Sequence, residues 1–383
     1  MQERPIFSDD HRQFRETVRR FFKKEAEPYL KEWEKRGMFD PGLFRKAGEA
    51  GILCAGIPAE YGGGGGDFLH HAILHEEAGY TIAGASMGGG LGIDGSSYII
   101  LAGGTEEQKK EWLPRYASGE CIAEACFTEP QSGSDVQGFR TSARKDGDDY
   151  IINGNKIWIT NGSMCTMLPV VCRTSDGPGS KSFSIFLVDT DMKGVSKGRP
   201  IETLHKGCAN EAEFFFEDVR VPRERLVGGQ EGNGFKQVMG SLNEMRIAEG
   251  ARYLAAAEHA FELTVEFVKN RKAFGQRILD FQNTQFRLAD IKAELMIGRA
   301  FIDQCLAKSQ HMDGKITPVE SSIAKLWTSE LEFRVMDQCL QFHGGMGYAH
   351  EMPISQLWTQ SRVHRILLGT SEIHRMAIGR SIV

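Results

Sequence analysis

The sequence predicts a multidomain α+β protein with a helical N-terminal domain (residues 1–120), a strand-rich middle domain (121–230) and a helical bundle (231–383). Three observations support this division. Apolar residues recur at helical spacing in the first 120 positions, short alternating runs separated by turn signals follow, and long helical periods return after Gly232. Because strands and helices do not alternate along the chain, a doubly wound parallel sheet is excluded.

Composition and charge narrow the class of protein. Of 383 residues, 41% are hydrophobic and 25% charged, which is too apolar for a disordered chain. The net charge of −5 argues against nucleic acid as a partner. No apolar run approaches the ~18–20 residues of a membrane helix, so we expect no membrane insertion. The first residues lack the apolar core of a signal peptide, and the eight cysteines form no CxxC pair. We therefore expect a cytoplasmic protein with reduced thiols and no metal site.

The N-terminal elements follow from the apolar period. From Ser8 to about Trp33 the pattern predicts one amphipathic helix, with Ser8 or Asp9 as its cap. Shorter helices are expected around 41–51, 67–80, 95–103 and 105–118, separated by glycine-rich breaks.

In the middle region the period changes to that of short strands. Strands are expected at Ala123–Thr128, Tyr150–Ile152, Lys156–Thr160, Met167–Cys172, Phe183–Val188 and Glu213–Phe216. Turns are expected at Asn153-Gly154, Asn161-Gly162 and 176–179.

Long helices with short connections are predicted after Gly232. They run from about Gly234 to Arg271, from Phe281 to Lys308 and from Val319 to Gln341, and a last helix follows Gly369. Such helices pack as an antiparallel bundle.

Two segments of the middle region carry candidate site residues. The run from Ala125 to Val136 (ACFTEPQSGSDV) ends a predicted strand in a Gly/Ser turn, whose amides and hydroxyls can bind a pyrophosphate or a cofactor's polar edge. The run KIWITNG places Trp158 and Thr160 at a strand end, where they could flank a planar ring. Both have simpler interpretations, because Ser-Gly-Ser-Asp is also ordinary turn chemistry and a strand tryptophan usually belongs to a core.

Taken together, these segments resemble the acyl-CoA dehydrogenase family of flavoproteins. The resemblance covers essentially the whole chain, and its motifs occur in the family's order. They are Thr128-Glu129-Pro130 with Gly133-Ser134-Asp135, Trp158 to Gly162, Gly232 to Phe235, Arg271 to Gly275, Gln341 to Tyr348, and Gly369 to Ile373.

The resemblance implies a fold, a cofactor and partners. The acyl-CoA dehydrogenase fold has an all-α N-domain, a β-barrel-like middle domain and an α-helical bundle as C-domain, binds FAD and an acyl-CoA substrate, and is usually a homotetramer. An electron-transferring flavoprotein is the expected electron acceptor. By motif, the cofactor residues would be Phe127, Thr128, Gly133, Ser134, Trp158, Ile159, Thr160, Arg271, Phe274, Gln341, Gly345, Thr370 and Glu372, some of them serving a neighbouring subunit. Ser134, Asn243 and Arg246 would contact the substrate.

The chain departs from the family at the catalytic base. In most relatives a glutamate directly precedes the Gly-Thr of the last motif, and here that position is Leu368. A minority place the glutamate directly before the arginine of the first long C-domain helix, and here that position is Met245. Neither side chain can accept a proton.

Three explanations remain open: catalysis is lost, Glu244 serves as the base, or a carboxylate elsewhere removes a different proton. Glu244 is one residue from the expected position, and one residue rotates a helical side chain by ~100°. Asp94, followed by Gly-Ser-Ser, lies in the N-domain segment that lines the acyl end of the pocket in relatives. It is equally suited to cap a helix.

The chemistry favours Asp94 as base. A substrate that already carries an α,β double bond has no α proton, and conjugation acidifies its γ proton instead. The sequence therefore resembles the cyclohex-1-ene-1-carboxyl-CoA dehydrogenase branch, in which an N-domain aspartate supports a 1,4-elimination. The alternatives are an ordinary α,β-dehydrogenase with an unusual base, a desulfinase, an enoyl-CoA reductase, and a non-catalytic acyl-CoA-binding paralogue.

Overall fold

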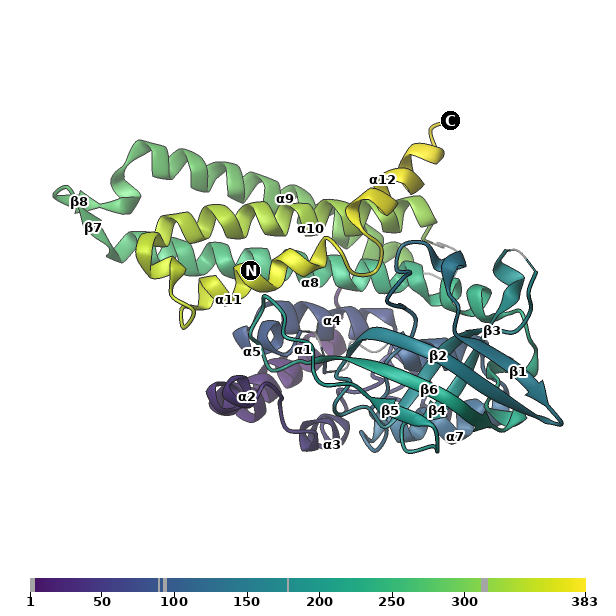
Figure 1. Cartoon of the computed structure of the whole chain (residues 1–383). Helices are drawn as coiled ribbons and strands as arrows, with labels where there is room; N and C mark the ends of the chain where they lie inside the picture. Colours follow the sequence, from purple (N-terminus) through teal and green to yellow (C-terminus); the bar gives the residue numbers. More distant parts are fainter. Residues whose placement is uncertain (1–3, 89, 92–94, 178, 311–315) are drawn as a thin grey trace.

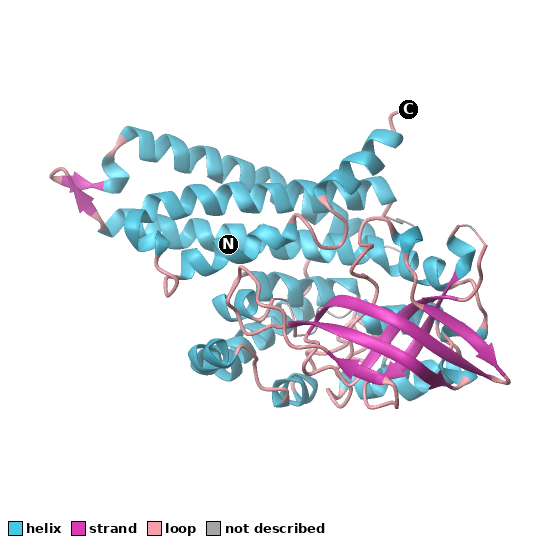
Figure 2. Cartoon of the chain, viewed as in Figure 1, coloured by secondary structure: helices cyan, strands magenta, loops and turns pink. Residues whose placement is uncertain are grey.

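The computed structural model describes residues 4–88, 90–91, 95–177, 179–310 and 316–383. Long C-terminal helices form one layer, and the N-terminal helices and a twisted sheet lie beneath it (Figures 1 and 2). The predicted α+β fold, with helical regions before and after a sheet, is confirmed.

Several of the N-terminal helices begin at residues whose side chains cap them. Ser8, Asp67 and Thr105 each form a capping box with the residue three positions later. The helices are α1 (Asp9–Phe21), α2 (Leu30–Arg36), α3 (Gly42–Glu49), α4 (Phe68–Gly79), α5 (Ile82–Ser86), α6 (Gly95–Gly103) and α7 (Glu106–Ala117).

The single helix predicted from Ser8 to Trp33 is wrong. It ends as an α-helix at Phe21 and continues through a π-helical turn (Phe22–Ala26) and a 3₁₀ turn (Glu27–Tyr29) into α2. Pro28 lies in the 3₁₀ turn and lacks the amide that a continuous helix would need.

The middle region forms one six-stranded sheet in the order β4-β3-β1-β2-β6-β5. Its strands are β1 (Ser142–Asp146), β2 (Asp149–Thr160), β3 (Met167–Arg173), β4 (Phe183–Asp189), β5 (Val195–Lys197) and β6 (Glu211–Val221). All pairs are antiparallel except β1 with β3. The two longest strands, β2 and β6, pair antiparallel, and in this pairing Thr160 lies opposite Glu211.

Three details of the strand prediction need correction. Asn153-Gly154 is not a turn: β2 passes through it with a register shift, and the turn lies at Gly147, where φ is 67°. The segment from Ala123 to Thr128 makes only isolated bridges at Ala123 and Cys126. Strands β1 and β5 were not predicted, because their residues are mostly polar and exposed.

The C-terminal helices are α8 (Gly234–Asn270), α9 (Gln282–Gln310), α10 (Pro318–His343), α11 (Pro353–His364) and α12 (Ser371–Arg380). A hairpin of β7 (Lys272–Ala273) and β8 (Gln276–Arg277) joins α8 to α9. Helix α11 was not predicted. A core cluster combines residues of α4, α8, α9, α10 and α11, so the bundle and the N-terminal helices share one hydrophobic core.

Two predictions about the whole chain can be compared with the structure. All eight cysteines are buried free thiols, as expected. Among the described residues, no helix is long and apolar enough to cross a membrane.

A buried carboxylate connects the N-terminal helices to the bundle. Glu76 on α4 is 2% exposed and accepts from Arg4, Arg15 and Arg299, each at 2.7 Å. Burial raises the pKa of its carboxyl, but the three guanidinium groups outweigh this and hold the pKa well below its usual range. Glu76 therefore links three segments, the chain start with α1, α4 and α9, within a larger set of ion pairs.

We predict that Glu76→Gln lowers the free energy of unfolding by about 1–3 kcal/mol, because Arg4, Arg15 and Arg299 each lose one carboxylate and keep only Asp303, Glu77 and Glu258, respectively. Glu32→Gln, at an exposed position, should change it by less than about 0.5 kcal/mol. Denaturant unfolding measures both.

The same ion pairs determine how the free energy of unfolding depends on pH. The folded pKa of Glu76 lies below the unfolded value of about 4.3, so its stabilisation is complete above that pH and is lost as the pH falls. A difference between wild type and Glu76→Gln that does not shrink in acid would contradict this account.

Candidate active site

A buried ion pair joins the Gly/Ser-rich turn to strand β2. The Lys156 ammonium donates to Glu129 Oε1 and to the Phe127 carbonyl, both at 2.8 Å. The two charged side chains are 0% and 1% exposed. Glu129 also accepts the amides of Arg140 at 2.6 Å and Thr141 at 2.9 Å. Both ends of the turn are therefore fixed to the sheet.

The pKa of Glu129 reflects this setting. Burial raises it, but the ammonium of Lys156 and the hydrogen bonds outweigh burial and lower the pKa below its ordinary value. Glu129 is therefore ionised at neutral pH.

The turn presents its predicted cofactor residues outward. Phe127 and Thr128 are half-buried, while Gly133 and Ser134 are exposed. A Cβ added at Gly133 would meet only Thr128 Cγ2, at 3.8 Å, so a bound group can approach this backbone closely.

Strand β2 bulges where the predicted ring-flanking residues lie. Its register with β6 shifts between Lys156 and Ile159, and Trp158 has a φ of 63°. A bulge re-aims the side chain at its centre, and the Trp158 indole is 53% exposed. Thr160 is half-buried, whereas the Ile159 side chain is 2% exposed in the sheet core, so only its backbone faces the site.

Asn161 connects the end of β2 to the N-terminal region. Its side-chain amide donates to the Gly90 carbonyl at 2.8 Å and to Glu124 Oε1 at 2.9 Å. Its φ of 55° is one that asparagine tolerates. The strand end is thereby held against the segment that leads to Asp94, and Asp94 itself lies outside the described residues.

The two positions that lack a base lie on different elements and have different surroundings. Met245 on α8 packs against the start of α6, because a Cβ at Gly95 would lie 2.4 Å from Met245 Cε. Leu368 lies in the turn between α11 and α12 with a φ of 53°, followed by Gly369 with a φ of 96°. Glu244 is half-buried on α8.

Cationic side chains surround the Leu368–Gly369 turn. Lys325 on α10 is fully buried, donates to the Gly369 carbonyl at 2.9 Å and has its pKa lowered by burial to about 8. Burial, and then the charge of Arg246, lower the pKa of His374 to about 3. Burial also lowers the pKa of Arg246, whose Nε has no hydrogen-bond partner among the described residues. Two cations, Lys325 and Arg246, and a neutral histidine therefore lie near Leu368, with the Glu330 carboxylate bound to the Ser371 hydroxyl.

Asn243, predicted to contact the substrate, is engaged within the chain. Its side-chain oxygen accepts from the Ser321 hydroxyl at 2.9 Å, and its amide donates to the Ile316 carbonyl at 3.4 Å. These bonds orient the face of α8 that also carries Arg246, three residues further along the helix.

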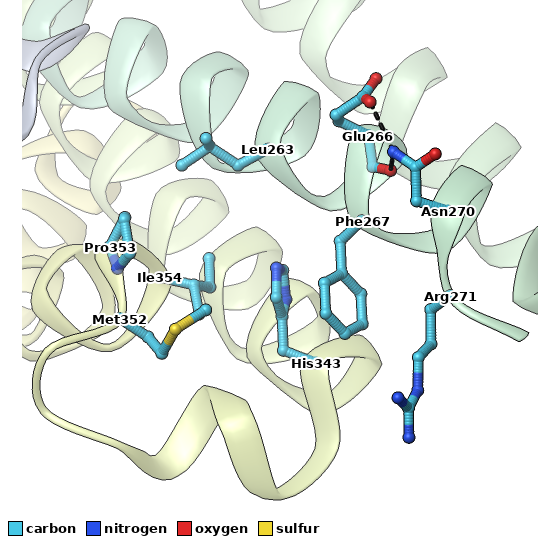
Figure 3. A pocket seen from close by; sticks show the side chains of 9 residues that line it. All are labelled: Leu263, Glu266, Phe267, Asn270, Arg271, His343, Met352, Pro353 and Ile354. Atoms are coloured by element: carbon cyan, nitrogen blue, oxygen red, sulfur yellow. Dashed lines mark hydrogen bonds between the residues drawn. The ribbon is translucent and has the colours of Figure 1, made fainter.

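A second group of predicted cofactor residues lies at the far end of the bundle. There a pocket of about 470 Å³ opens beside Arg271, with the rings of Phe267 and His343 4.3 Å apart (Figure 3). Its lining is Leu263, Glu266, Phe267, Asn270, Arg271, His343, Met352, Pro353 and Ile354.

The remaining predicted cofactor residues are accessible but lie in two places: Phe274, Gln341 and Gly345 at this end of the bundle, and Thr370 and Glu372 at the start of α12, where Lys325 near the start of α10 binds Gly369. Phe274, in the β7–β8 hairpin, is 95% exposed, and Gln341 and Gly345 are exposed at the end of α10. Thr370 caps α12 by accepting the Ile373 amide at 3.3 Å, and Glu372 is exposed in the first turn of that helix.

The two groups are not brought together within one chain. Figure 1 places β7 and β8 at one end of the long helices and strand β2 at the other side of the molecule. Trp158 and Thr160 therefore cannot meet the same part of a ligand as Arg271 and Phe274 of their own chain.

Sequence reasoning missed four residues of this region. Lys156, Glu129 and Asn161 lie inside the recognised motifs, and a lysine at an inward strand position is the signal that a partner must be buried with it. Glu211, opposite Thr160, gives no motif signal, because only the strand register shows its neighbour.

Comparison with known families identifies the family to which the chain is similar. The chain matches the family models described as acyl-CoA dehydrogenase N-terminal domain over residues 8–120, middle domain over 125–219 and C-terminal domain over 232–383. It is 40% identical to the mitochondrial long-chain specific acyl-CoA dehydrogenase of Rattus norvegicus, over 99% of this chain and 88% of that protein.

Solved structures with a similar fold come from the same family. An acyl-CoA dehydrogenase of Geobacillus kaustophilus superposes with a TM-score of 0.95 at 38% identity, over 99% of this chain and 100% of that one. An acyl-CoA dehydrogenase of Bacillus anthracis complexed with FAD has a TM-score of 0.90 at 30% identity, over 98% of this chain and 67% of that one.

A chain from a structure described as the electron transferring flavoprotein of Acidaminococcus fermentans has a TM-score of 0.91 at 30% identity, over 98% of both chains. The three family models together span nearly the whole sequence. The chain thus belongs to the acyl-CoA dehydrogenase family, whose members are FAD-dependent oxidoreductases acting on CH–CH groups.

Proposed function

We propose that this dehydrogenase acts on a cyclic α,β-unsaturated acyl-CoA, converting cyclohex-1-ene-1-carboxyl-CoA to cyclohexa-1,5-diene-1-carboxyl-CoA with Asp94 as base. The observation that carries the proposal is that both family base positions, Leu368 and Met245, are apolar while the other motifs of the resemblance are present in the sequence. A substrate without an α proton needs no base at either position.

The packing of Met245 supports a base on the neighbouring segment. The methionine Cε occupies the space next to Gly95, the residue that follows Asp94 in the chain. An acid beside this apolar surface would remove a proton further along the acyl group than the usual glutamates do, which is the γ position of a conjugated thioester.

The residues present fit FAD. The exposed Trp158 in its strained conformation, the half-buried Thr160 and the open backbone at Gly133 offer an aromatic face, a hydroxyl and room for a polar edge. The pocket of about 470 Å³ beside Arg271 has the size of a ligand site and a cation for a pyrophosphate.

When bound, FAD supplies the acceptor for the hydride that leaves the ring. The protein's own groups do the rest. Asp94 would take the γ proton, and Ser134 and Asn243 would border the acyl thioester. Arg246, whose Nε has no hydrogen-bond partner among the described residues, would bind the anionic CoA part of the substrate. Leu368 and Met245 keep the α carbon free of any base, which suppresses ordinary α,β-dehydrogenation.

The separation of the two groups of predicted cofactor residues favours an oligomer in which neighbouring subunits share each cofactor site. In this proposal the flavin half of the cofactor is held by Phe127, Thr128 and Ser134 together with the end of β2. Thr370 and Glu372 lie at the start of α12. Arg271, Phe274, Gln341 and Gly345 hold the dinucleotide of a neighbouring subunit. A homotetramer would complete every site in this way.

Electrons would leave to an electron-transferring flavoprotein, and the similarity to a chain of the Acidaminococcus fermentans structure supports that partner. The free buried thiols suit a reducing compartment such as the cytoplasm.

We predict that Asp94→Asn lowers turnover of the cyclic substrate by about 10²–10⁴-fold, because it removes the general base. FAD content, measured from visible absorbance, should stay at the wild-type level. Glu244→Gln is the matched control and should retain activity. Activity retained in Asp94→Asn, or lost in Glu244→Gln alone, would overturn the base assignment.

We predict that Leu368→Glu creates ordinary α,β-dehydrogenation of saturated acyl-CoA thioesters, because a carboxylate there would be ionised beside Lys325 and Arg246. Product analysis by mass spectrometry measures it. Leu368→Gln, of the same shape but unable to take a proton, serves as the control. Equal activity of the Glu and Gln variants would count against the proposed reason for the leucine.

We predict complementation between Gly133→Phe and Gly345→Phe. Both glycines have room for a side chain, so the fold should tolerate the change while cofactor binding is blocked. Each variant alone should lose FAD, and co-expression should restore it at about a quarter of the sites, because mixed oligomers pair two intact halves. No restoration would mean that one chain holds both halves.

A further inference from the structure

Glu211 is an acidic residue that the proposed reaction does not use. It begins strand β6 and is the direct antiparallel partner of Thr160, and the next pair is Ile159 with Ala212. Side chains of directly opposed residues lie on the same face of a sheet, with their Cβ atoms about 4.5–5.5 Å apart. Ile159 and Ala212 are buried in the sheet core, so Thr160 and Glu211 share the opposite face.

The backbone around Glu211 is held in place. Its carbonyl accepts the Ile201 amide at 2.8 Å. The carbonyl of the preceding residue, Asn210, accepts the Gly162 amide at 3.2 Å, and the Asn210 side chain accepts the Ser163 amide at 3.0 Å. Glu211 therefore stays beside the end of β2, where Trp158 and Thr160 lie.

The carboxyl of Glu211 has no compensating charge. Burial raises its pKa to about 7, its own backbone amide is the sole opposing cause, and no charged side chain of the described residues contributes. The charged groups on the flanking elements are otherwise engaged or exposed: Lys156 with Glu129, Glu124 with Asn161, Glu213 with Asn155, and the exposed Arg199 and Glu202.

Glu213 provides an internal comparison. It lies two residues further along β6 on the same face, and its carboxylate accepts from the Asn155 side chain at 3.1 Å. The two glutamates thus differ in their hydrogen-bond donor, which is its own backbone amide for Glu211 and the Asn155 side chain for Glu213, and in their distance from the end of β2.

We propose that Glu211 is a redox-linked proton site: it takes up one proton when the flavin is reduced and releases it when the flavin is reoxidised. This rests on the proposed placement of the flavin at Trp158 and Thr160. The inference concerns the chain's response to the flavin's charge and is independent of which acyl-CoA delivers the electrons.

Electrostatics supplies the reason. Two electrons and one proton reach the flavin as a hydride, which leaves it one negative charge. A like charge beside a desolvated carboxyl raises the pKa of that carboxyl further. Glu211 then takes a second proton from solvent, and both protons return to solvent when a flavoprotein acceptor withdraws the two electrons. Reduction is thereby coupled to two protons instead of one.

The test is the midpoint potential of the bound flavin as a function of pH, measured by spectroelectrochemistry without any CoA thioester. In wild type the potential should fall with pH twice as steeply between pH 7 and the higher pKa of the reduced state as it does in Glu211→Gln. Glu213→Gln should behave as wild type. Identical slopes in wild type and Glu211→Gln would overturn the proposal.

A second readout uses the oxidised protein. Ionisation of Glu211 should shift the visible flavin absorption with a midpoint near pH 7 in wild type and in Glu213→Gln, and not in Glu211→Gln. If Glu211→Gln does not retain FAD, Glu211→Asp keeps the carboxyl and should still titrate. Absence of any titration in wild type would overturn the proposal.

Trp158→Phe separates this inference from the proposed placement of the flavin. A changed flavin spectrum in that variant supports the placement, and silent Glu211 variants would then overturn the redox-linked role alone. An unchanged spectrum in Trp158→Phe would remove the placement and this proposal together, while the base assignment to Asp94 would be judged by its own variant.

Discussion

The candidate site depends on the buried pair of Lys156 and Glu129. Two charges without access to water are costly unless every donor and acceptor is matched, and here the carboxylate also accepts two backbone amides while the ammonium also binds a carbonyl. The consequence is geometric. The turn that carries Gly133 and Ser134 and the strand that carries Trp158 form one rigid unit. The bulge at Trp158 and the amide of Asn161 then extend that unit to the N-terminal segment.

Much of the fold could be predicted from periodicity, because long amphipathic helices and buried strands have strong patterns. The failures have physical causes. Pro28 interrupts a pattern that is otherwise helical, and Asn153-Gly154 has turn chemistry but is absorbed into β2 by a register shift. Within the site, motif residues could be found from sequence order. Glu211 could not, because its significance arises from pairing with Thr160 fifty residues earlier in the chain.

The changed base positions alter the electrostatics of the pocket as well as its chemistry. Lys325 and Arg246 remain around the Leu368–Gly369 turn although no carboxylate stands at position 368. Burial lowers the pKa of both cations, and His374 stays neutral beside them. A site of this kind stabilises negative charge that develops on a bound thioester while offering no proton acceptor at the α carbon. The base must then come from a different element, and Asp94 is our assignment.

The account can be tested most directly by anaerobic mixing of the FAD-loaded protein with a panel of CoA thioesters, following the visible absorbance of the flavin. It predicts bleaching by cyclohex-1-ene-1-carboxyl-CoA, with the conjugated diene as product, and little or none by saturated straight-chain thioesters. Bleaching by saturated thioesters in preference to the cyclic one, or by no thioester at all, would contradict it.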